Sequence, residues 1–468
     1  MDVTIDTDQT ADSRREPERS YRRPVPALTK RRLLGAGGLL TGATLAACGT
    51  FPGSEAPAAS QQPKTVVFHT DWITGVRGEL VKQALAQWAQ TQPKIRIDKQ
   101  DAASGTGVSF IDQMVARISS DTIGDMALWD YWNTEIWAKR GVFSNITPVL
   151  KKLKYNVDEQ NIYVRESIFW KDRQFGMPFQ IRCFGWVYNR SAFLQQSVPE
   201  PQENWTWDTL IETARRLNQP EQNQWGLLPD DAFWSIIYQH GGEVVSQDRK
   251  KTLFDTPQTL AGLEFVTALY QRHRIAPPPA VQTERQLRTT TGNYRIWFDG
   301  GAGPGLQTQI GNLMEIDLAP LPLLTQTGKR VTTMNDQPHV VFAAAQKHNV
   351  LEEVTQFALY MAGDFVGGLF VDLNAGAIPT KKSALNSPTF LKSPPRNTKR
   401  LMDGFKYARP SLDFGAGIPF QSSWVPFRTR MYNGELSPRE AAQLMVAAGD
   451  TALANGSCGV CGQADIWK

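Results

Sequence analysis

Hydrophobic and polar residues alternate along residues 64–141 in two different periods. Residues 65–69 form a strand-like run, Ile95 and Ile97 alternate with polar residues as in a strand, and residues 125–128 form a third short run. Between them, apolar residues recur at helical spacing from Val76 to Trp88 and again over 110–118, where Ser109 and Asp112 are spaced as a capping box. The order strand, helix, strand, helix, strand predicts an α/β fold with an open parallel sheet.

The same reading continues to the C-terminal end of the chain. Thr206 is expected to cap one helix, and Ser437, followed by Pro438, is expected to begin the last one. The other expected elements are a hairpin over 168–179, strands over 185–189, 294–298, 318–321 and 340–343, and helices over 232–240, 257–274 and 351–361.

One apolar stretch lies outside this pattern, near the N-terminus. Residues 33–47 are small and apolar, follow eight basic residues, and end at Cys48. A membrane-spanning helix needs ~20 apolar residues, so the stretch is too short for one. We expect residues 1–47 to be a signal peptide. The basic run that ends in Arg31 and Arg32 resembles the twin-arginine signal, and the sequence leaves the choice between twin-arginine and general export open. The alternative, a short buried helix, fits poorly with its glycines.

Residues 45–48 resemble the bacterial lipobox, in which the cysteine is lipidated and becomes the new N-terminus. This resemblance implies lipidation of Cys48 and work outside the cytoplasm, at the membrane surface. Residues 48–63 are rich in Pro, Ala, Ser and Gln and are expected to be a flexible linker. We expect no second apolar run to reach bilayer length.

Composition narrows the range of partners. Without residues 1–47 the chain keeps 421 residues, enough for two hydrophobic cores, with 42 basic and 40 acidic side chains. A nearly neutral chain is a poor partner for nucleic acid. We expect a monomer.

The cysteines and histidines give little sign of a metal or cofactor. Cys458 and Cys461 form a C-x-x-C pair in a Gly-rich tail without further ligands nearby, so we expect a local disulfide there and a buried thiol at Cys183. The five histidines include no H-E-x-x-H motif. No metal and no cofactor are expected.

Four motifs carry a resemblance to a known family. They are residues 185–193 (GWVYNRSAF), 205–208 (WTWD), 254–257 (FDTP) and 375–379 (AGAIP). In this order the chain resembles the extracellular solute-binding proteins of ABC importers, in particular the sugar-binding class that includes the maltose-binding proteins. It departs from their pattern at residues 199–204, where the usual proline pair is replaced, and in the C-x-x-C tail.

The resemblance implies a two-lobed periplasmic-binding-protein fold. Each lobe would be an open sheet flanked by helices, with the ligand cleft between the lobes. The chain would cross near residues 180–186, 338–342 and 378. Lobe 1 would comprise residues 64–180 plus 340–378, and lobe 2 residues 183–338 plus 380–468. The implied function is capture of a carbohydrate by cleft closure and its delivery to ABC permease subunits, without catalysis.

The candidate ligand-binding residues follow from the chemistry of sugars. Sugars need flat aromatic surfaces and groups that hydrogen-bond to hydroxyls, and in α/β sheets ligands lie beyond the carboxyl ends of strands. Three aromatic and carboxylate couples are expected at such ends: Asp71 with Trp72, Trp129 with Asp130, and Trp297 with Asp299. Further candidates are Arg182, Trp234, Tyr238, Asn335 and Trp424. For each tryptophan the alternative is core packing, which we expect for Trp88, Trp137 and Trp207.

Two other functions stay open at this stage. A glycosidase would need two carboxylates that flank the glycosidic bond, and Asp130 and Asp299 are candidates, although the sequence does not set their separation. A protein that presents bound solute to a sensory receptor would have the same sequence pattern as a transport protein.

Overall fold

We describe a computed structural model of the chain. The described residues are 63–102, 109–129, 134–248, 250–300, 304–410 and 417–454. The predicted signal peptide with Cys48, nearly all of the predicted linker, Asp130, and the tail with Cys458 and Cys461 lie outside these residues.

The first sheet contains the predicted parallel strands. Its order is β12-β6-β11-β3-β1-β2, and β13 pairs with β11. β2, β1 and β3 are parallel, while β11 is antiparallel to both β3 and β6. The strands are β1 (Lys64–Thr70), β2 (Ile95–Asp101), β3 (Met126–Leu128), β6 (Gly176–Cys183), β11 (Thr332–Val341), β12 (Ile378–Pro379) and β13 (Ala408–Pro410).

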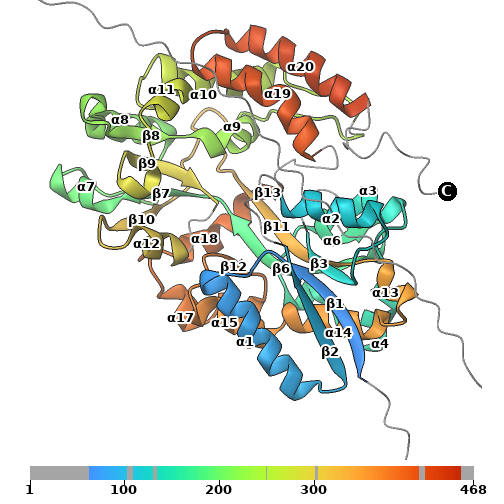
Figure 1. Ribbon diagram of the computed structural model, residues 1–468. Helices are drawn as coiled ribbons and strands as arrows, with labels where there is room; N and C mark the ends of the chain where they lie inside the picture. The colour runs from blue at the N-terminus through green and yellow to red at the C-terminus, as the bar shows by residue number, and fades with distance from the viewer. Residues whose placement is uncertain are drawn as a thin grey trace, which may run out of the picture. The chain divides into compact units, whose positions relative to one another are not determined.

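A second sheet has the order β10-β7-β9-β8, in which β8 and β9 are parallel. Its strands are β7 (Gly185–Asn189), β8 (Trp225–Leu228), β9 (Tyr294–Asp299) and β10 (Ile316–Ala319). The predicted hairpin is present as β4 (Phe169–Trp170) and β5 (Arg173–Gln174). β6 and β11 lie side by side (Figure 1), and Phe184 alone separates β6 in the first sheet from β7 in the second.

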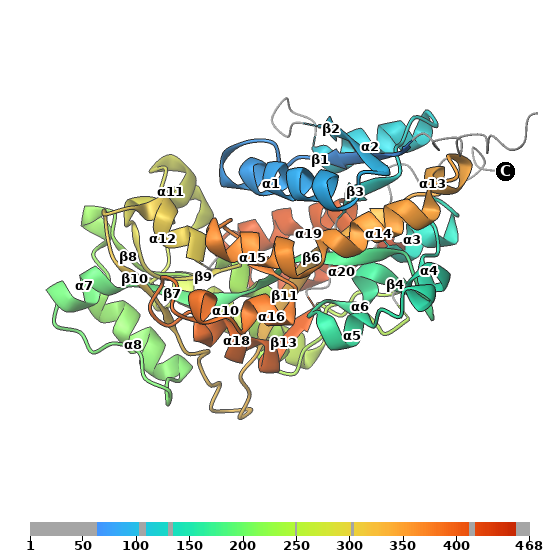
Figure 2. The same ribbon diagram turned by 90° about the horizontal axis from the view of Figure 1, so that it is seen from below.

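Helices cover both sheets. With the first sheet go α1 (Gly75–Thr91), α2 (Phe110–Ser119), α3 (Thr134–Lys139), α4 (Thr147–Lys152), α5 (Val157–Gln160), α6 (Arg165–Ile168), α13 (Ala344–Lys347), α14 (Leu351–Met361) and α15 (Asp364–Asp372). α1 and α15 lie side by side in Figure 2 and are in contact, and α14 packs against β1, β6 and β11.

The remaining helices follow β7 in the sequence. They are α7 (Arg190–Gln195), α8 (Trp207–Leu217), α9 (Phe233–Gln239), α10 (Pro257–Gln271), α11 (Pro279–Glu284), α12 (Pro304–Ile310), α16 (Lys382–Leu385), α17 (Pro388–Leu391), α18 (Lys399–Gly404), α19 (Gly417–Tyr432) and α20 (Pro438–Ala454). Short 3-10 turns are η1 (Pro220–Gln222), η2 (Asp230–Ala232), η3 (Thr289–Thr291) and η4 (Phe405–Tyr407).

The predicted helix caps are present. The Ser109 side chain accepts a hydrogen bond from the Asp112 backbone N–H at 3.1 Å at the start of α2. Thr206 accepts one from the Thr209 N–H at the start of α8, and Ser437 accepts one from the Glu440 N–H at the start of α20. Each bond satisfies a backbone donor that has no partner inside the helix.

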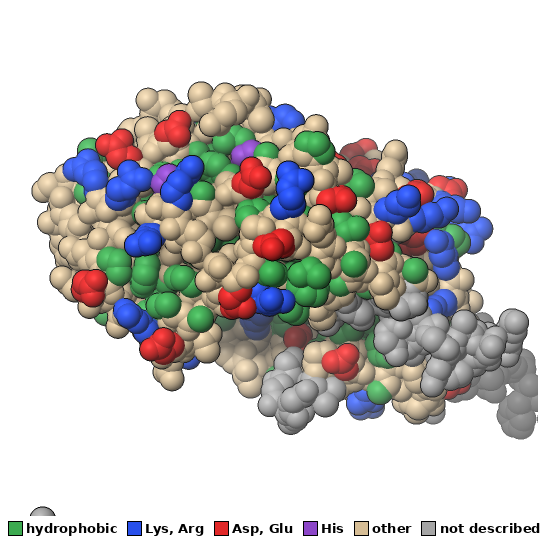
Figure 3. Space-filling view, turned by 90° about the horizontal axis from the view of Figure 1, so that it is seen from above, with side chains coloured by type: hydrophobic (Ala, Val, Ile, Leu, Met, Phe, Trp, Pro, Cys, Tyr) green, Lys and Arg blue, Asp and Glu red, His purple; other side chains and the backbone are tan. Residues whose placement is uncertain are grey.

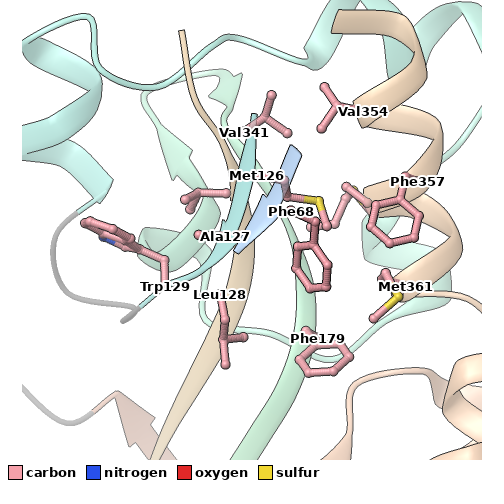
Figure 4. Packing of buried hydrophobic residues seen from close by; sticks show 14 of the residues in the cluster. Phe68, Met126, Ala127, Leu128, Trp129, Phe179, Val341, Val354, Phe357 and Met361 are labelled. Atoms are coloured by element: carbon pink, nitrogen blue, oxygen red, sulfur yellow. The ribbon is translucent and has the colours of Figure 1, made fainter. Parts of the chain in front are cut away.

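Buried apolar side chains form separate clusters on the two sheets. In the first, Phe68 of β1 points toward Phe357 and Met361 of α14 (Figure 4), and its ring centroid lies 5.4 Å from that of Phe357. This cluster uses only residues from 66–179 and 340–375, and another uses only residues from 186–324 and 420–445. A third, which includes Ile181 and Ile378, joins the crossing strands to the second sheet. The lobe boundaries expected from the resemblance follow this division and stay a prediction.

One expectation about a segment was correct only in part, and a second was wrong. The strand expected over 340–343 is the end of β11, which begins at Thr332. The first part of β11 was not predicted because its middle residues are polar. Pro338 lies where the register with β6 shifts. The expectation that no second apolar run reaches bilayer length also fails. Residues Leu351–Asp372 contain an 18-residue window with a mean hydropathy of 1.3, which is long and apolar enough. The stretch forms α14 and α15, however, and 56% of that window is buried in the protein.

On the face shown in Figure 3, Lys and Arg side chains are interspersed with Asp and Glu side chains. This mixed surface agrees with the small net charge of +4.

Candidate functional site

The carboxyl ends of several strands meet where the chain passes between the sheets. β1 and β3 are parallel and end just before Asp71 and Trp129. β6 runs in the same direction because β11 is antiparallel to both β3 and β6, and Arg182 stands at its end. In the second sheet Asp299 ends β9 and pairs with Gly185, two residues after β6 ends. The fold therefore brings Asp71, Trp129, Arg182 and Asp299 to one region.

A polar row lines one face of the crossing strands. In the antiparallel register Gln180 pairs with Gln337 and Arg182 pairs with Asn335, so these four side chains share a face. Gln180 Nε2 donates a hydrogen bond to Gln337 Oε1. Gln180 is buried, Asn335 and Gln337 are half-buried, and Arg182 is exposed. We call Gln180, Arg182, Asn335 and Gln337 the polar row.

Two cavities adjoin the polar row. The first, of about 280 Å³, we call the arginine cavity; it is lined by Arg77, Ile181, Arg182, Thr289, Thr290, Asp299, Gly300, Leu306, Gln309, Gly376, Ala377 and Ile378. The second, of about 200 Å³, we call the glutamine cavity; it is lined by Asp71, Ser109, Phe110, Ile111, Leu128, Trp129 and Gln337. Both volumes lie below the range of about 300–1,000 Å³ that is usual for small-molecule sites.

Residues distant in sequence form the wall of the arginine cavity. Gly305 in the first turn of α12 packs directly on Gly376, because a Cβ added at Gly305 would lie 2.3 Å from the Gly376 Cα. Gly376 itself has a φ of +68°, which other residues adopt rarely. The AGAIP motif at residues 375–379 therefore forms part of the wall of the arginine cavity.

Arg77 joins the two cavities electrostatically. Its guanidinium lies 4.8 Å from the centroid of the Trp72 ring, a cation–π geometry, and its Nη2 donates to the Gly376 carbonyl oxygen at 3.4 Å. Burial and the positive charge of Arg182 lower the pKa of Arg77, whereas Asp71 raises it. No sequence signal singled out Arg77, because a basic residue in the first turn of a helix is an ordinary surface residue.

Trp72 has a different role from the one predicted. Its side chain is 3% exposed and packs against Phe179 at 4.9 Å and Phe370 at 5.5 Å between ring centroids. The ring therefore supports Arg77 and the core rather than offering a face to a ligand.

The stacking role predicted for Trp129 and Trp297 is also corrected. Both side chains are 0% exposed. Trp129 lies across β3 from Phe68 (Figure 4), and its ring meets those of Trp137, Phe143 and Phe342 edge to face at 5.5–5.8 Å. Trp297 lies in the third cluster, and its Nε1 donates to Asp299 Oδ2 at 3.3 Å. Both rings are therefore packed in the protein, and Trp129 borders the glutamine cavity without exposing a ring face for stacking.

Trp234 and Trp424 pack on each other, away from the linings of both cavities. Their ring centroids are 5.4 Å apart, edge to face, and Trp424 stacks on Phe233 at 5.3 Å. They are 9% and 1% exposed. The core packing expected for Trp88, Trp137 and Trp207 is confirmed, since each is 3% exposed or less.

Asp231 is a polar residue of this region that sequence reasoning missed. It follows β8, which is parallel to β9, so it lies at the same sheet edge as Asp299. Its side chain reaches solvent but is recessed among other groups: desolvation, then the charges of Asp230 and Asp299, raise its pKa to about 6, against the opposing effect of Arg428 and Arg182. The rule that ligands lie beyond strand ends, applied to β8, would have identified it.

The described residues contain no group of three or more His, Cys, Asp or Glu side chains that could hold a metal ion. His69 and His339 are buried in the core, and desolvation lowers their pKa values to about 4 and about 3. Cys183 is a free, buried thiol, as predicted, and burial raises its pKa to about 12.

Solved structures share this fold at low sequence identity. A substrate-binding protein of an ABC transporter from Listeria monocytogenes, in complex with cycloalternan, is 18% identical, with a TM-score of 0.71 over 84% of this chain and 98% of that one. The cyclic alpha-maltosyl-1,6-maltose binding protein of Arthrobacter globiformis is 16% identical, with a TM-score of 0.70 over 84% and 100%. A solute-binding protein from Thermotoga lettingae, bound with alpha-D-tagatose, has a TM-score of 0.68 at 17% identity, over 83% and 100%. These similarities confirm the two-lobed α/β fold.

A curated relative and a family model give the sequence comparison. The mannitol-binding protein of Pseudomonas aeruginosa is 23% identical over 195 residues, which is 39% of this chain and 44% of that protein. The alignment thus spans less than half of the relative. The model of the bacterial extracellular solute-binding proteins matches residues 74–364, well over half of the chain, and the chain therefore belongs to the family of bacterial extracellular solute-binding proteins.

Proposed function

We propose that this chain captures a carbohydrate between its two sheets and delivers it to the permease subunits of an ABC transporter. The observation that carries the proposal is the polar row with its two cavities. Carboxylate, amide and guanidinium groups from segments far apart in sequence belong to the polar row or line its two cavities. Paired hydrogen bonds to adjacent hydroxyls need groups of these kinds.

The relatives favour a sugar as the solute. Cycloalternan, a cyclic maltosyl-maltose, tagatose and mannitol are the compounds named for them, and all carry many hydroxyl groups. The proposed ligand residues are Asp71, Arg77, Arg182, Asp299, Asn335 and Gln337. Asp130, which lies outside the described residues, stays a candidate.

The crossing strands supply a physical route to closure. Lobe 1 would be residues 64–180 plus 340–378, and lobe 2 residues 183–338 plus 380–468. With so few crossings, a hinge motion needs only small backbone changes near Phe184, Thr332 and Pro379. A ligand that contacts both lobes would favour the closed state by its differential affinity.

Membership of an extracellular family makes the chain an exported protein. We further propose that Cys48 carries a lipid anchor, that Cys458 and Cys461 form a disulfide, and that the protein acts as a monomer. Labelled fatty acid should enter the wild type but not Cys48→Ser; label retained in that variant would contradict the anchor.

The proposal includes binding without turnover. A glycosidase would need carboxylates on both sides of a glycosidic bond. Asp299 and Asp231 come from the same sheet edge, an arrangement that suits hydrogen bonding to one face of a sugar. Product analysis after prolonged incubation with bound oligosaccharides decides this point: unchanged sugar is expected, and cleaved sugar would favour the glycosidase.

A thermal-shift screen tests the central proposal. The full chain is heated with alditols, monosaccharides and linear and cyclic oligosaccharides, and one class should raise the melting temperature, because a ligand of the native state stabilises it. Titration calorimetry on the positive class should give one site per chain. If no carbohydrate shifts the melting temperature while amino acids or peptides do, the proposal is wrong.

A further inference from the structure

The arginine cavity contains two guanidinium groups and little negative charge to balance them. Arg182 is exposed and makes no hydrogen bond and no ion pair with any described residue. Arg77 has only the 3.4 Å contact with the Gly376 carbonyl oxygen among its hydrogen bonds to described residues. An arginine offers five N–H donors, so most of the donors of this pair stay available to a ligand.

The carboxylates nearby leave this positive charge incompletely compensated. Among the described lining residues Asp299 is the one carboxylate, and its Oδ2 already accepts a hydrogen bond from the Trp297 indole. Asp71 interacts electrostatically with Arg77, but it lines the glutamine cavity and not the arginine cavity. Asp231 interacts electrostatically with Arg428 as well as with Arg182, so its negative charge is divided between two cations.

Arg77 is held in place before any ligand arrives. It lies in the first turn of α1, and the partial positive charge of that helix end adds to its own charge, because the turn contains no acidic residue. The Trp72 ring, itself fixed by Phe179 and Phe370, lies against its guanidinium. A charged group held rigidly in this way loses little conformational entropy on binding.

The rest of the lining suits the ring of a sugar. Thr289 and Thr290 are half-buried, Gln309 is exposed, and their side chains make no hydrogen bond with a described residue. Leu306, Ala377 and Ile378 supply apolar surface for C–H groups. The cavity therefore combines two cations with neutral hydrogen-bonding groups and apolar contacts.

Building on the proposed function, we infer that the solute is an acidic sugar, whose carboxylate is held between Arg77 and Arg182 in the arginine cavity. A carboxylate accepts paired hydrogen bonds from a guanidinium, and a neutral hydroxyl in the same position would leave the two cations facing each other. Hydrogen bonds to charged groups are worth enough for a preference of roughly ten- to hundred-fold over the uncharged analogue.

The test compares acids with their own uncharged esters. The probes are D-galacturonate and D-glucuronate as monomers, dimers and trimers, the same compounds with methyl-esterified carboxyl groups, and the neutral sugars of the screen. Titration calorimetry on the full chain should show at least one acid binding roughly ten-fold or more tightly than its ester.

Variants place the effect in the cavity. Arg182→Gln keeps donors but removes one of the two charges, and it should weaken binding of the acid clearly more than binding of the ester. Arg173→Gln, at an exposed arginine in the β5 strand of the hairpin, is the matched control and should leave both affinities unchanged. Circular dichroism melts check that both variants are folded.

Each other outcome overturns the inference in a recognisable way. Equal binding of acid and ester, or equal weakening of both by Arg182→Gln, means that Arg182 recognises hydroxyl groups only. Binding of neutral sugars alone refutes the acidic solute but leaves the proposed function intact. If no acidic, esterified or neutral sugar binds, the inference and the proposed function both fail.

Discussion

The tryptophans at the strand ends and the polar row on the crossing strands lie in the same region of the molecule, but they differ in burial. Trp129 and Trp297 are fully buried, although each stands at or beside the carboxyl end of its strand. Arg182, at the end of β6, is exposed, and Asn335 opposite it is half-buried. Position at a strand end is therefore not enough to make a residue part of the site.

The difference lies in what each side chain can gain from the protein itself. A tryptophan buries a large apolar area when other rings surround it, and Trp129 has three aromatic partners within 5.8 Å. The Arg182 guanidinium gains nothing comparable, because its charge is costly to bury without a partner. Polar side chains that the fold leaves without partners mark this site better than aromatic ones do.

The largest effect is expected on stability, when one of the two buried tryptophans is replaced. Trp129→Ala and Trp297→Ala should each lower the free energy of unfolding by about 3–5 kcal/mol, because each leaves a cavity in a packed cluster. Denaturant unfolding curves measure the loss. Trp170→Ala, at a half-buried position in the hairpin, is the control and should cost clearly less. Unchanged stability together with lost sugar binding would show that the two tryptophans contact the ligand.

A second prediction uses Asp336, which alternates with the polar row along β11 and faces the other way. It is fully buried, and its Oδ2 accepts hydrogen bonds from Ser167 Oγ at 2.8 Å and the Val164 N–H at 3.0 Å. Desolvation raises its pKa to about 7, with a smaller contribution from Glu166, against these hydrogen bonds. The folded state therefore binds a proton that the unfolded state has already lost between pH ~4 and ~7.

The sign of the pH dependence follows from that proton. The contribution of Asp336 to stability is present below the unfolded pKa, falls as the pH rises, and is lost above the folded pKa. From pH ~5 to pH ~8 the loss should be roughly 2–3 kcal/mol, and Asp336→Asn should remove it from the pH profile. Urea unfolding at the two pH values gives the free energy of unfolding of the wild type and of Asp336→Asn. If this free energy changes equally with pH in both proteins, Asp336 is ionised in the folded state throughout.

A smaller effect is expected on sugar affinity, when Asn335 of the polar row is replaced. Asn335 is half-buried beside Arg182 and makes no hydrogen bond through its side chain with a described residue. Asn335→Ala should therefore change the free energy of unfolding by less than ~0.5 kcal/mol while weakening sugar binding by about ten-fold. Calorimetry and denaturant melts on the same preparation test this. A stability loss of ~2 kcal/mol or more with unchanged affinity would place Asn335 in the structure rather than the site.

Much of the fold was predictable from local patterns. The period of apolar residues gave α1, α2 and β1 through β3, and the caps at Ser109, Thr206 and Ser437 are local chemistry. The beginning of β11 was missed because residues 335–337 are polar, and a polar run bounded by Pro338 does not look like an interior strand.

The site was predictable only in part. Asp71 and Asp299 were expected near the ligand because they follow or end predicted strands, Arg182 was a further candidate, and all three line the two cavities. The burial of Trp129, Trp234 and Trp424 depends on ring partners contributed by distant segments, such as Phe342 and Phe233. Arg77 reaches the site because Trp72 and Gly376 position it, and no periodicity in the sequence encodes such a contact.

A crystal structure of the full chain with the tightest-binding sugar from the screen tests the central claim most directly. We predict sugar oxygens within hydrogen-bond distance of Arg182 and at least one other member of the polar row, with the rings of Trp129 and Trp297 still buried among their present partners. A sugar stacked on either of those rings, with Arg182 out of reach of every ligand atom, would contradict the account.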